Sequence, residues 1–427
     1  MIRTDLPLTR RELPFSTNGF GFDGVLCPSV HKGQVAHSTY LFAPENPCAS
    51  SYRIDLKQTA ENSRFLFHEA QKSLALSGDA MPYNLTESQW REYALAPHSY
   101  LALGNGVYQV GLNYFNRFLH LDTRSAQAFL LDPGVNDEFL SSTNWYDPEA
   151  DELWFASWSA LHTLQRNLDP LAPVTVTLWS YALRREKKKL IWRGNLGDSL
   201  HQLCLSPDGR FLVVAELGLR SLTPNELAPS TVLILDLQTL REWRMELPAA
   251  AHVEFDPEDP AVCYLSEHNI GLVGPKVGIF GPATLRKIRL TPDGPQTLGL
   301  FTHPDFHRIT THIVLKRHQQ TLLALSGYPG HLFLLDAANL SLAKLITMDA
   351  ADRVDLSNLP HLCTQDSYGI AASADGKHLL VCKTGRLEIY DSQTSRMIFA
   401  ENIKDEGQAS CFTGHLGLMT PSSGAIS

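Results

Sequence analysis

A strand–turn–strand pattern recurs four times in the C-terminal half of the chain and constrains the fold more than any other feature. The copies read HQLCLSPDGRFLVVAE, HVEFDPEDPAVCYLSE, HIVLKRHQQTLLALSG and YGIAASADGKHLLVCK, and they begin at residues 201, 252, 312 and 368. Intervals of 50 to 60 residues are typical of four-stranded blades with long loops. The recurrence therefore predicts an all-β chain folded as a β-propeller.

Each unit carries the turns that a four-stranded blade needs. SPDG at 206–209 and SADG at 373–376 are expected to join a first strand to a second, because Asp-Gly supplies the positive φ of a tight hairpin. A third strand then ends in Asp, and we expect this Asp to form the next turn rather than act as a catalytic acid. The three third strands are TVLILDL (231–237), HLFLLDA (331–337) and RLEIYDS (386–392).

The N-terminal half repeats the pattern less cleanly. A first unit would use residues 34–44 and 51–56, and CFTGHLGLMT (411–420) is expected to close the ring by pairing with N-terminal strands. The resulting prediction is seven blades in a single domain, residues 1–427. Residues 57–97 interrupt the pattern and are predicted to be a helical or irregular insertion, and residues 160–173 a second one.

Composition narrows the class of partner. The formal net charge is −9 and charged residues make up 19% of the chain, which disfavours a nucleic-acid footprint. No run of about 18 apolar residues occurs, so no membrane span is expected. Seven cysteines without close spacing indicate a reducing compartment, and we predict a cytoplasmic protein. A small-molecule substrate is the expected partner, and the oligomeric state is left open.

Three histidines stand at or next to the openings of successive repeats. Aligning the second strands puts His252 and His312 at one position, which Gln202 shares, and puts His201 one residue earlier. Equivalent positions of radial repeats converge on one axis, so these imidazoles are expected to approach one another. They could bind a divalent metal such as Mn, Fe or Zn, fill a polar channel as structural hydrogen-bond partners, or act as a general acid or base.

Other candidate groups lie near this predicted centre. Gln365 offers an oxygen ligand, and Arg308 stands beside the pair His303 and His307, which we expect in a loop rather than a helix. His268, in the sequence SEHNIG, ends the second strand of its unit. Arg308 is the arginine that we predict to contact an anionic substrate group.

The stretch HVEFDPEDPAVCYLSEHN (252–269) resembles a blade of the oligogalacturonate lyases, and residues 311–315 and 365–368 stand where that family places later ligands. The resemblance spans roughly residues 200–390. It implies a seven-bladed propeller with a manganese site of three histidines and a glutamine. It also implies elimination across the glycosidic bond of short pectic fragments. By this resemblance His252 is a base or polariser, and His312 and Gln365 are metal ligands.

Two functions from different classes follow. The first is a lyase-like enzyme, with or without a bound metal, that eliminates or isomerises a small polar or carbohydrate-type molecule. Its catalytic residues would be His252, Tyr368 and Arg308, and its metal ligands His201, His252, His312 and Gln365. The alternative is a non-catalytic propeller that binds a protein or a small ligand on its top face, because propellers host both roles.

Overall fold

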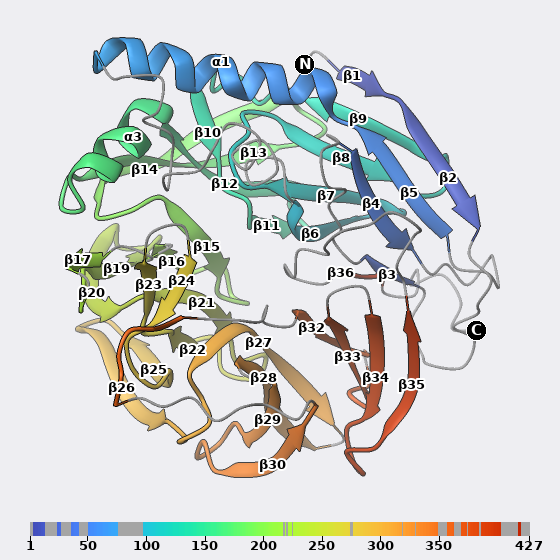
Figure 1. The fold of residues 1–427 in the computed structure, drawn as a ribbon, viewed down its shortest axis with the longest axis vertical. Coiled ribbons are helices and arrows are strands. Elements are labelled where there is room, and N and C mark those ends of the chain that lie inside the picture. Colours follow the sequence, from blue (N-terminus) through green and yellow to red (C-terminus); the bar gives the residue numbers. More distant parts are fainter. Residues whose placement is uncertain are drawn as a thin grey trace.

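The chain forms antiparallel sheets arranged around a common centre, as a computed structural model shows (Figure 1). Two sheets have five strands and four have four, and we number them sheet 1 to sheet 6 in chain order of their innermost strands. The structure describes residues 3–12, 24–26, 36–41, 50–75, 97–216, 218, 221–223, 225–273, 276–317, 319–328, 330–348, 357–362, 369–373, 375–383, 386–402 and 417–419.

Sheets 1 and 2 come from the N-terminal half of the chain. The order in sheet 1 is β6-β7-β8-β9-β1, so the N-terminal strand pairs at its outer edge. In sheet 2 both β10 and β11 pair with β12, which β13 and β14 follow. The strands are β6 (Pro97–Gly104), β7 (Val107–Leu112), β8 (Phe118–Asp122), β9 (Gln127–Leu131), β1 (Arg3–Leu6), β10 (Glu138–Leu140), β11 (Trp145–Asp147), β12 (Glu152–Ser159), β13 (Val174–Ala182) and β14 (Lys187–Leu196).

Sheets 3 and 4 contain the first two sequence repeats. Each sheet runs outward in chain order, with a short hairpin inserted between its second and third strands. Sheet 3 is β15 (Leu200–Leu205), β16 (Phe211–Glu216), β19 (Pro229–Asp236) and β20 (Arg241–Pro248), with the hairpin β17 (Ser221–Thr223) and β18 (Glu226–Leu227). Sheet 4 is β21 (Ala250–Phe255), β22 (Val262–Glu267), β25 (Thr284–Thr291) and β26 (Gly294–Phe301), with the hairpin β23 (Ile270–Val273) and β24 (Lys276–Ile279), which pairs with β31 (His361–Leu362).

Sheets 5 and 6 contain the last two repeats. Sheet 5 is β27 (Arg308–Arg317), β28 (Gln320–Tyr328), β29 (His331–Asp336) and β30 (Leu342–Thr347). Sheet 6 is β32 (Gly369–Ala372), β33 (His378–Lys383), β34 (Arg386–Asp391) and β35 (Met397–Asn402). The remaining strands form a sheet of three, β2 (Leu8–Glu12), β5 (Ser50–Asp55) and β4 (Ala36–Leu41), and a pair, β3 (Gly24–Leu26) and β36 (Gly417–Met419).

The innermost strands form a closed cycle of contacts. β6 lies against β11, β11 against β15, and then β15, β21, β27 and β32 follow in turn. The cycle closes through β36, which contacts both β32 and β6. These contacts and the radial sheets establish a β-propeller. The expected pairing of 411–420 with an N-terminal strand is confirmed, since β36 pairs with β3. The count of seven blades is not confirmed, because the described residues form six sheets of four or five strands.

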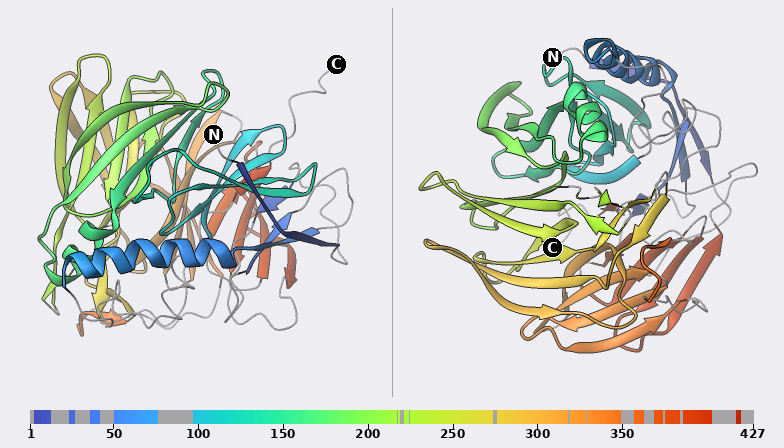
Figure 2. Two further views of the ribbon diagram at one scale, coloured as in Figure 1. Left: turned by 90° about the horizontal axis from the view of Figure 1, so that it is seen from above. Right: turned by 60° about the vertical axis from the view of Figure 1, so that its left-hand side comes forward.

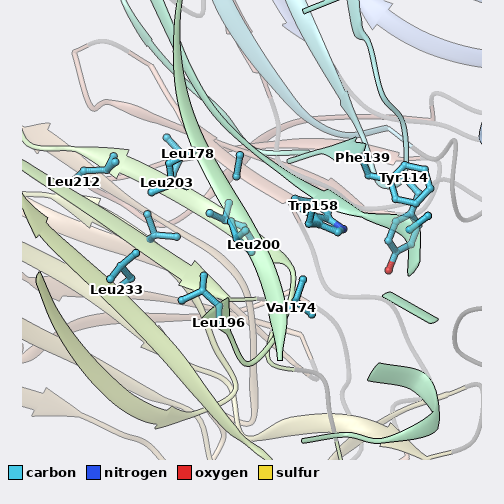
Figure 3. Close-up of a cluster of buried hydrophobic side chains, with 14 of the residues drawn as sticks. Tyr114, Phe139, Trp158, Val174, Leu178, Leu196, Leu200, Leu203, Leu212 and Leu233 are labelled. Atoms are coloured by element: carbon cyan, nitrogen blue, oxygen red, sulfur yellow. The ribbon is translucent and has the colours of Figure 1, made fainter. Parts of the chain in front are cut away.

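Apolar side chains fill the spaces between neighbouring sheets. One cluster joins sheets 2 and 3 through residues such as Trp158, Val174, Leu200 and Leu212, all buried (Figure 3). Further clusters lie between sheets 3 and 4, sheets 4 and 5, and sheets 5 and 6. Sheets 3, 4 and 5 therefore bury both faces, which explains why their inner strands read as nearly continuous apolar runs.

The described ranges contain two helices that stand outside the ring of sheets. α1 (Lys57–Ser73) lies along the ring and contacts α3 (Ala160–Leu168), as the turned views show (Figure 2). The second insertion is confirmed as helical, and Ser159 caps α3 by accepting a hydrogen bond from the backbone N–H of Leu161. α1 occupies residues 57–73 of the first predicted insertion, whereas residues 76–96 of that insertion lie outside the described residues.

The turn chemistry agrees with the sequence prediction. Gly209 and Gly376 adopt φ angles of +70° and +67°. Asp236 ends β19, and its Oδ1 accepts from the backbone N–H groups of Gln238 and Thr239 at 2.9 and 3.1 Å. Asp391 does the same at the end of β34. The aspartates that end third strands are therefore turn formers, as predicted.

A polar segment interrupts the inner strand of sheet 2. Residues 141–144 separate β10 from β11, and Ser142 comes so close to sheet 1 that its carbonyl oxygen accepts a hydrogen bond from Ser99 Oγ. Gly111, the ladder partner of Ser99, makes this approach possible. A Cβ built on Gly111 would collide with the Ser142 carbonyl. Glycine is thus required here for close backbone packing.

Replacing Gly111 by Ala should destabilise the protein by at least about 2 kcal/mol, because backbone atoms cannot move aside as a flexible side chain would. Urea unfolding measures this loss. Gly299→Ala in β26 is the matched control, since the nearest atom to its new Cβ is Leu340 Cδ1 at 3.5 Å. Equal stability of the two variants would contradict the close approach of Ser142.

Candidate functional site

Three histidines occupy the same kind of position in three inner strands. His98, His201 and His252 each lie where the ladder between the first and second strands shifts register. A register shift of this kind is a β-bulge, which re-aims a side chain away from the regular alternation. The shifts fall between Pro97 and Ser99, between Leu200 and Gln202, and between Ala250 and Val253.

These bulges bring the imidazoles together in a buried cluster. The ring centroids of His98 and His201 are 4.8 Å apart, and those of His201 and His252 are 4.6 Å apart. His252 also lies 5.3 Å from His268 and 6.4 Å from His312. His201, His252, His268 and His312 are each no more than 7% exposed. We call His98, His201, His252, His268 and His312 the histidine cluster.

The central contact of the cluster joins two ring nitrogens. His201 Nε2 lies 3.4 Å from His252 Nε2. This distance is longer than the usual N–H···O hydrogen bond of 2.7–3.2 Å, yet short enough for the two nitrogens to share a proton or a cation. Both atoms belong to side chains that are at least nine-tenths buried. The two imidazoles could therefore bind one proton or one cation together.

The neighbouring sheet supports His252 on its other side. Gln202 Oε1 lies 3.2 Å from His252 Nδ1 and accepts a hydrogen bond from the backbone N–H of Val253 at 3.0 Å. Gln202 also forms a side-chain hydrogen bond with Glu254. These contacts cross from β15 to β21, so they join sheet 3 to sheet 4 at the histidine cluster.

Ser266 fixes the backbone beneath the cluster. Its hydroxyl oxygen accepts from the backbone N–H of His252 at 3.3 Å and lies 3.1 Å from His268 Nε2. His268 directly follows β22, so the end of the second strand of sheet 4 adds a fourth imidazole to the inner-strand histidines. The sequence singled out His268, and the structure places it beside His252.

His312 belongs to the cluster in a different way. It pairs with Leu325, whereas its neighbour Thr311 pairs with Ser326, the counterpart of Ser266. The predicted matching register of His252 and His312 is therefore wrong by one residue. The physical reason is the tight turn after Arg317, which pairs with Gln320 and shifts the ladder relative to an ungapped alignment.

The bonding of His312 follows from this position. Its Nε2 donates to the backbone carbonyl of Tyr264 at 3.1 Å, because a carbonyl oxygen can only accept. Burial lowers the pKa of His312 to about 4, although the hydrogen bond to Tyr264 opposes the shift. His312 is thus neutral near pH 7, and its Nε2 is engaged by sheet 4.

Burial also sets the charge of two other groups at the site. It lowers the pKa of His98 to about 4, so this imidazole is neutral near pH 7. Burial raises the pKa of Glu254 to about 7, and the hydrogen bond from Gln202 opposes that shift. Desolvation penalises the charged form in both cases, which makes a base weaker and an acid weaker alike.

Gln365 and Tyr368 lie outside the described residues, so their roles stay predictions. Arg308 lies in β27, where it pairs with Tyr328 across the ladder. His303 and His307 lie between β26 and β27 in a segment without helix, as expected.

Metal binding by the described ranges would require several ligands close together. There, no three His, Cys, Asp or Glu side chains are grouped so that they alone could hold a metal ion. The described residues supply two nitrogens at a suitable separation, those of His201 and His252. The predicted set of three histidines and a glutamine thus stays a prediction, with Gln365 outside the described residues.

The sequence prediction missed His98. Its signal was available, because His98 directly precedes the apolar strand SYLALG just as His201 precedes QLCL. The N-terminal units lack the SPDG turn that made the later repeats easy to align. The buried polar segment 141–144, next to His98 through the hydrogen bond of Ser99, was missed as well.

Comparisons with known proteins add little to this geometry. No protein-family model matches the chain, and no curated protein matches it. Hydrazine synthase of Kuenenia stuttgartiensis is similar in structure at 11% identity, with a TM-score of 0.44 over 69% of this chain and 76% of that chain. A chain of a mitotic checkpoint complex is similar at 10% identity, with a TM-score of 0.37 over 55% and 62%. At these scores neither similarity carries an argument about function.

Glu254 gives a prediction about stability and pH. Unfolded, this carboxyl titrates near 4.5, whereas in the folded protein it titrates near 7. The folded state therefore binds more protons between these pH values, and stability falls as pH rises through that window. The shift corresponds to roughly 3 kcal/mol at about 1.36 kcal/mol per pKa unit.

Glu254→Gln should remove this loss, so the variant should gain on the wild type by up to about 3 kcal/mol between pH 4.5 and pH 7. Urea unfolding at several pH values measures the difference. Glu149→Gln, in an exposed turn, is the matched control and should run parallel to the wild type. Parallel curves for Glu254→Gln as well would contradict the burial of an ionisable carboxyl at this site.

Proposed function

We propose that this propeller is an enzyme that transfers protons on a small polar molecule at the histidine cluster, in an elimination or isomerisation. The observation that carries the proposal is the 3.4 Å separation of His201 Nε2 and His252 Nε2 in a buried setting. Two imidazole nitrogens that face each other at this distance are suited to general acid–base chemistry, in which one group removes a proton and another returns it.

The chemistry needs one group that removes a proton and one that returns it. In an elimination, a base takes the proton next to a carbonyl or carboxyl group, and an acid protonates the departing oxygen. His252 would be the base and His201 its proton-sharing partner. The neutral imidazoles of His98 and His312 keep the surroundings free of positive charge near pH 7.

A divalent metal ion between the two nitrogens is the second candidate role. Two nitrogens at about 2.0–2.1 Å from a tetrahedral Zn²⁺ ion lie about 3.3–3.4 Å apart, which matches the observed separation. Metal-binding histidines also usually donate their second N–H to an oxygen, as His252 does to Gln202. The ion would polarise a substrate oxygen, and Gln365 is the predicted further ligand.

The substrate class is proposed from the sequence resemblance. Residues 252–269 resemble a blade of oligogalacturonate lyases, so short uronic acid oligosaccharides are the first substrates to test. Arg308 would contact their carboxylate and Tyr368 would assist proton transfer. We also propose a cytoplasmic location, which the free and buried thiols of Cys204 and Cys263 support.

The alternative is a propeller that binds a protein or a small ligand on its top face without catalysis. The insertion hairpins β17–β18 and β23–β24 lie at the end of the ring where the inner strands begin, because they follow Glu216 and Glu267, which pair with Leu200 and Ala250. Binding residues are often found on connections of this kind, so the position of the hairpins favours a binding role for that end. The two hairpins contact each other at this end of the ring, which is the end that carries the histidine cluster. Binding of a ligand without any turnover of it would favour this alternative.

We further propose that the remaining strands form a seventh blade. β36 lies between β32 and β6, pairs with β3, and β3 contacts β4 of the three-stranded sheet β4-β5-β2. Such a blade would hold the ring closed by joining both ends of the chain.

Leu418→Pro should lower the melting temperature by several degrees, since proline removes an N–H from the ladder between β36 and β3, where residue 418 pairs with Val25. Calorimetry measures it, with Leu418→Ala as the control that keeps the backbone N–H. Identical melting of the two variants would count against ring closure through β36.

His201→Ala and His252→Ala should each lower the rate at which an unsaturated product forms from uronic acid oligosaccharides. The expected loss is at least about 100-fold, the usual effect of removing a general acid or base. The new carbon–carbon double bond is followed by ultraviolet absorbance. His378→Ala, in sheet 6, is the matched control and should retain activity.

Elemental analysis of the same proteins separates the two roles. A divalent metal that copurifies with the wild type and is lost from both variants would assign the pair to metal binding. Activity without bound metal would assign it to acid–base catalysis. Full activity in both histidine variants would show that this cluster is not the reaction site.

A further inference from the structure

We propose that Gln202 is a positioning residue that fixes the proton of His252 on Nδ1 and thereby leaves Nε2 as the reactive nitrogen. The inference rests on the proposed function for its consequence, but its physical content concerns one tautomer and stands on geometry alone. The group that faces His252 Nδ1 is an amide, which distinguishes the arrangement from a histidine that contacts a carboxylate directly.

The identity of the Gln202 atom facing His252 follows from a second contact. A backbone N–H can only donate, and the N–H of Val253 points at Gln202 Oε1 at 3.0 Å. The atom there must therefore be the carbonyl oxygen. The same oxygen lies 3.2 Å from His252 Nδ1, so Nδ1 must carry the proton of that hydrogen bond. In a neutral ring with one proton, Nε2 then holds the lone pair.

Glu254 holds the amide in this orientation from the other side. Because Oε1 is engaged by Val253 and His252, the hydrogen bond between Gln202 and Glu254 uses the amide N–H of Gln202. A flipped amide would set its NH₂ group against the N–H of Val253 and its oxygen against the Glu254 carboxyl. Both changes leave buried groups without partners, which costs about 1–3 kcal/mol each.

The register explains why Gln202 can reach His252. Gln202 pairs with Ala215, and Ser266, the counterpart of Ala215 in sheet 4, hydrogen-bonds to the backbone of His252. The two residues thus occupy equivalent positions in neighbouring sheets. Sheet 3 contributes His201 and Gln202 in succession, so one side chain faces Nε2 of His252 and the next faces Nδ1.

The consequence is a defined direction for the reactive lone pair. Nε2 of His252 points toward His201, where a proton or a metal ion can bind, and Nδ1 is blocked by Gln202. An imidazole without this partner would exchange between two tautomers, and a part of the population would present an N–H where a base or a ligand is needed. Losing such a partner typically costs 10–100-fold in metal affinity or activity.

Nitrogen-15 spectroscopy of protein labelled at histidine tests the inference directly. At about pH 8, above the ordinary histidine pKa of about 6.5, the wild type should show His252 with its proton on Nδ1. The signal is assigned by its loss in His252→Gln. Gln202→Leu should move the proton to Nε2 in a large part of the population, and a proton on Nε2 in the wild type would overturn the inference.

Two further variants separate positioning from general packing. The double variant Gln202→Glu with Glu254→Gln exchanges the acid and the amide while it keeps an oxygen facing His252 Nδ1, so the Nδ1 tautomer should return. Gln109→Leu removes another buried glutamine, which lies in β7, and should leave His252 unchanged. A tautomer change in Gln109→Leu equal to that in Gln202→Leu would contradict a specific role of Gln202.

The spectrum tests the positioning role of Gln202 and the activity assay tests the proposed function, so either hypothesis can be wrong without the other. If the wild-type tautomer is on Nδ1 and responds to Gln202, the positioning role holds even when no variant of His201 or His252 alters turnover. If turnover depends on both histidines but the tautomer is insensitive to Gln202→Leu, the proposed function holds and the positioning role is wrong.

Discussion

The register shift at the start of the inner strands is the local feature on which the histidine cluster depends. A regular strand would alternate its side chains and send neighbouring residues to opposite faces. The bulges at His98, His201 and His252 release the chain from that alternation at one level of the ring. Radial packing then brings the same level of several sheets together. A site is created because the same small irregularity recurs in repeats that share an axis.

Much of the architecture could be predicted because it is encoded locally. The Asp-Gly turns at 208–209 and 375–376 and the aspartates that end third strands are chemical requirements of short connections, and the structure has them where the sequence placed them. The pairing of residues 417–419 with 24–26 was also predictable, since a propeller must close its ring. The number of complete blades was not, because the N-terminal units lack the SPDG-type turn between their first and second strands.

The site was harder to predict because it depends on register. An alignment without gaps equates His252 with His312, but one tight turn after Arg317 moves His312 to the next rung. A shift of one residue exchanges the faces of a strand. His312 thus binds the carbonyl of Tyr264 instead of facing His201. Conversely, His98 was overlooked although it precedes an apolar strand as His201 does, because its unit lacks the SPDG turn by which the later repeats align.

The polar groups around His252 offset the free-energy cost of burying a cluster of imidazoles. An imidazole pair in an apolar interior loses the hydrogen bonds of water, and the protein restores them from the next sheet rather than from the same strand. One oxygen of Gln202 accepts hydrogen bonds from Nδ1 of His252 and from the backbone N–H of Val253, and the amide N–H of Gln202 donates to Glu254. Because these bonds cross between sheets 3 and 4, the geometry of the site and the packing of the ring are set together. A change in the angle between the two sheets would break the same bonds that orient the imidazole, so the rigidity of the propeller is itself part of the site.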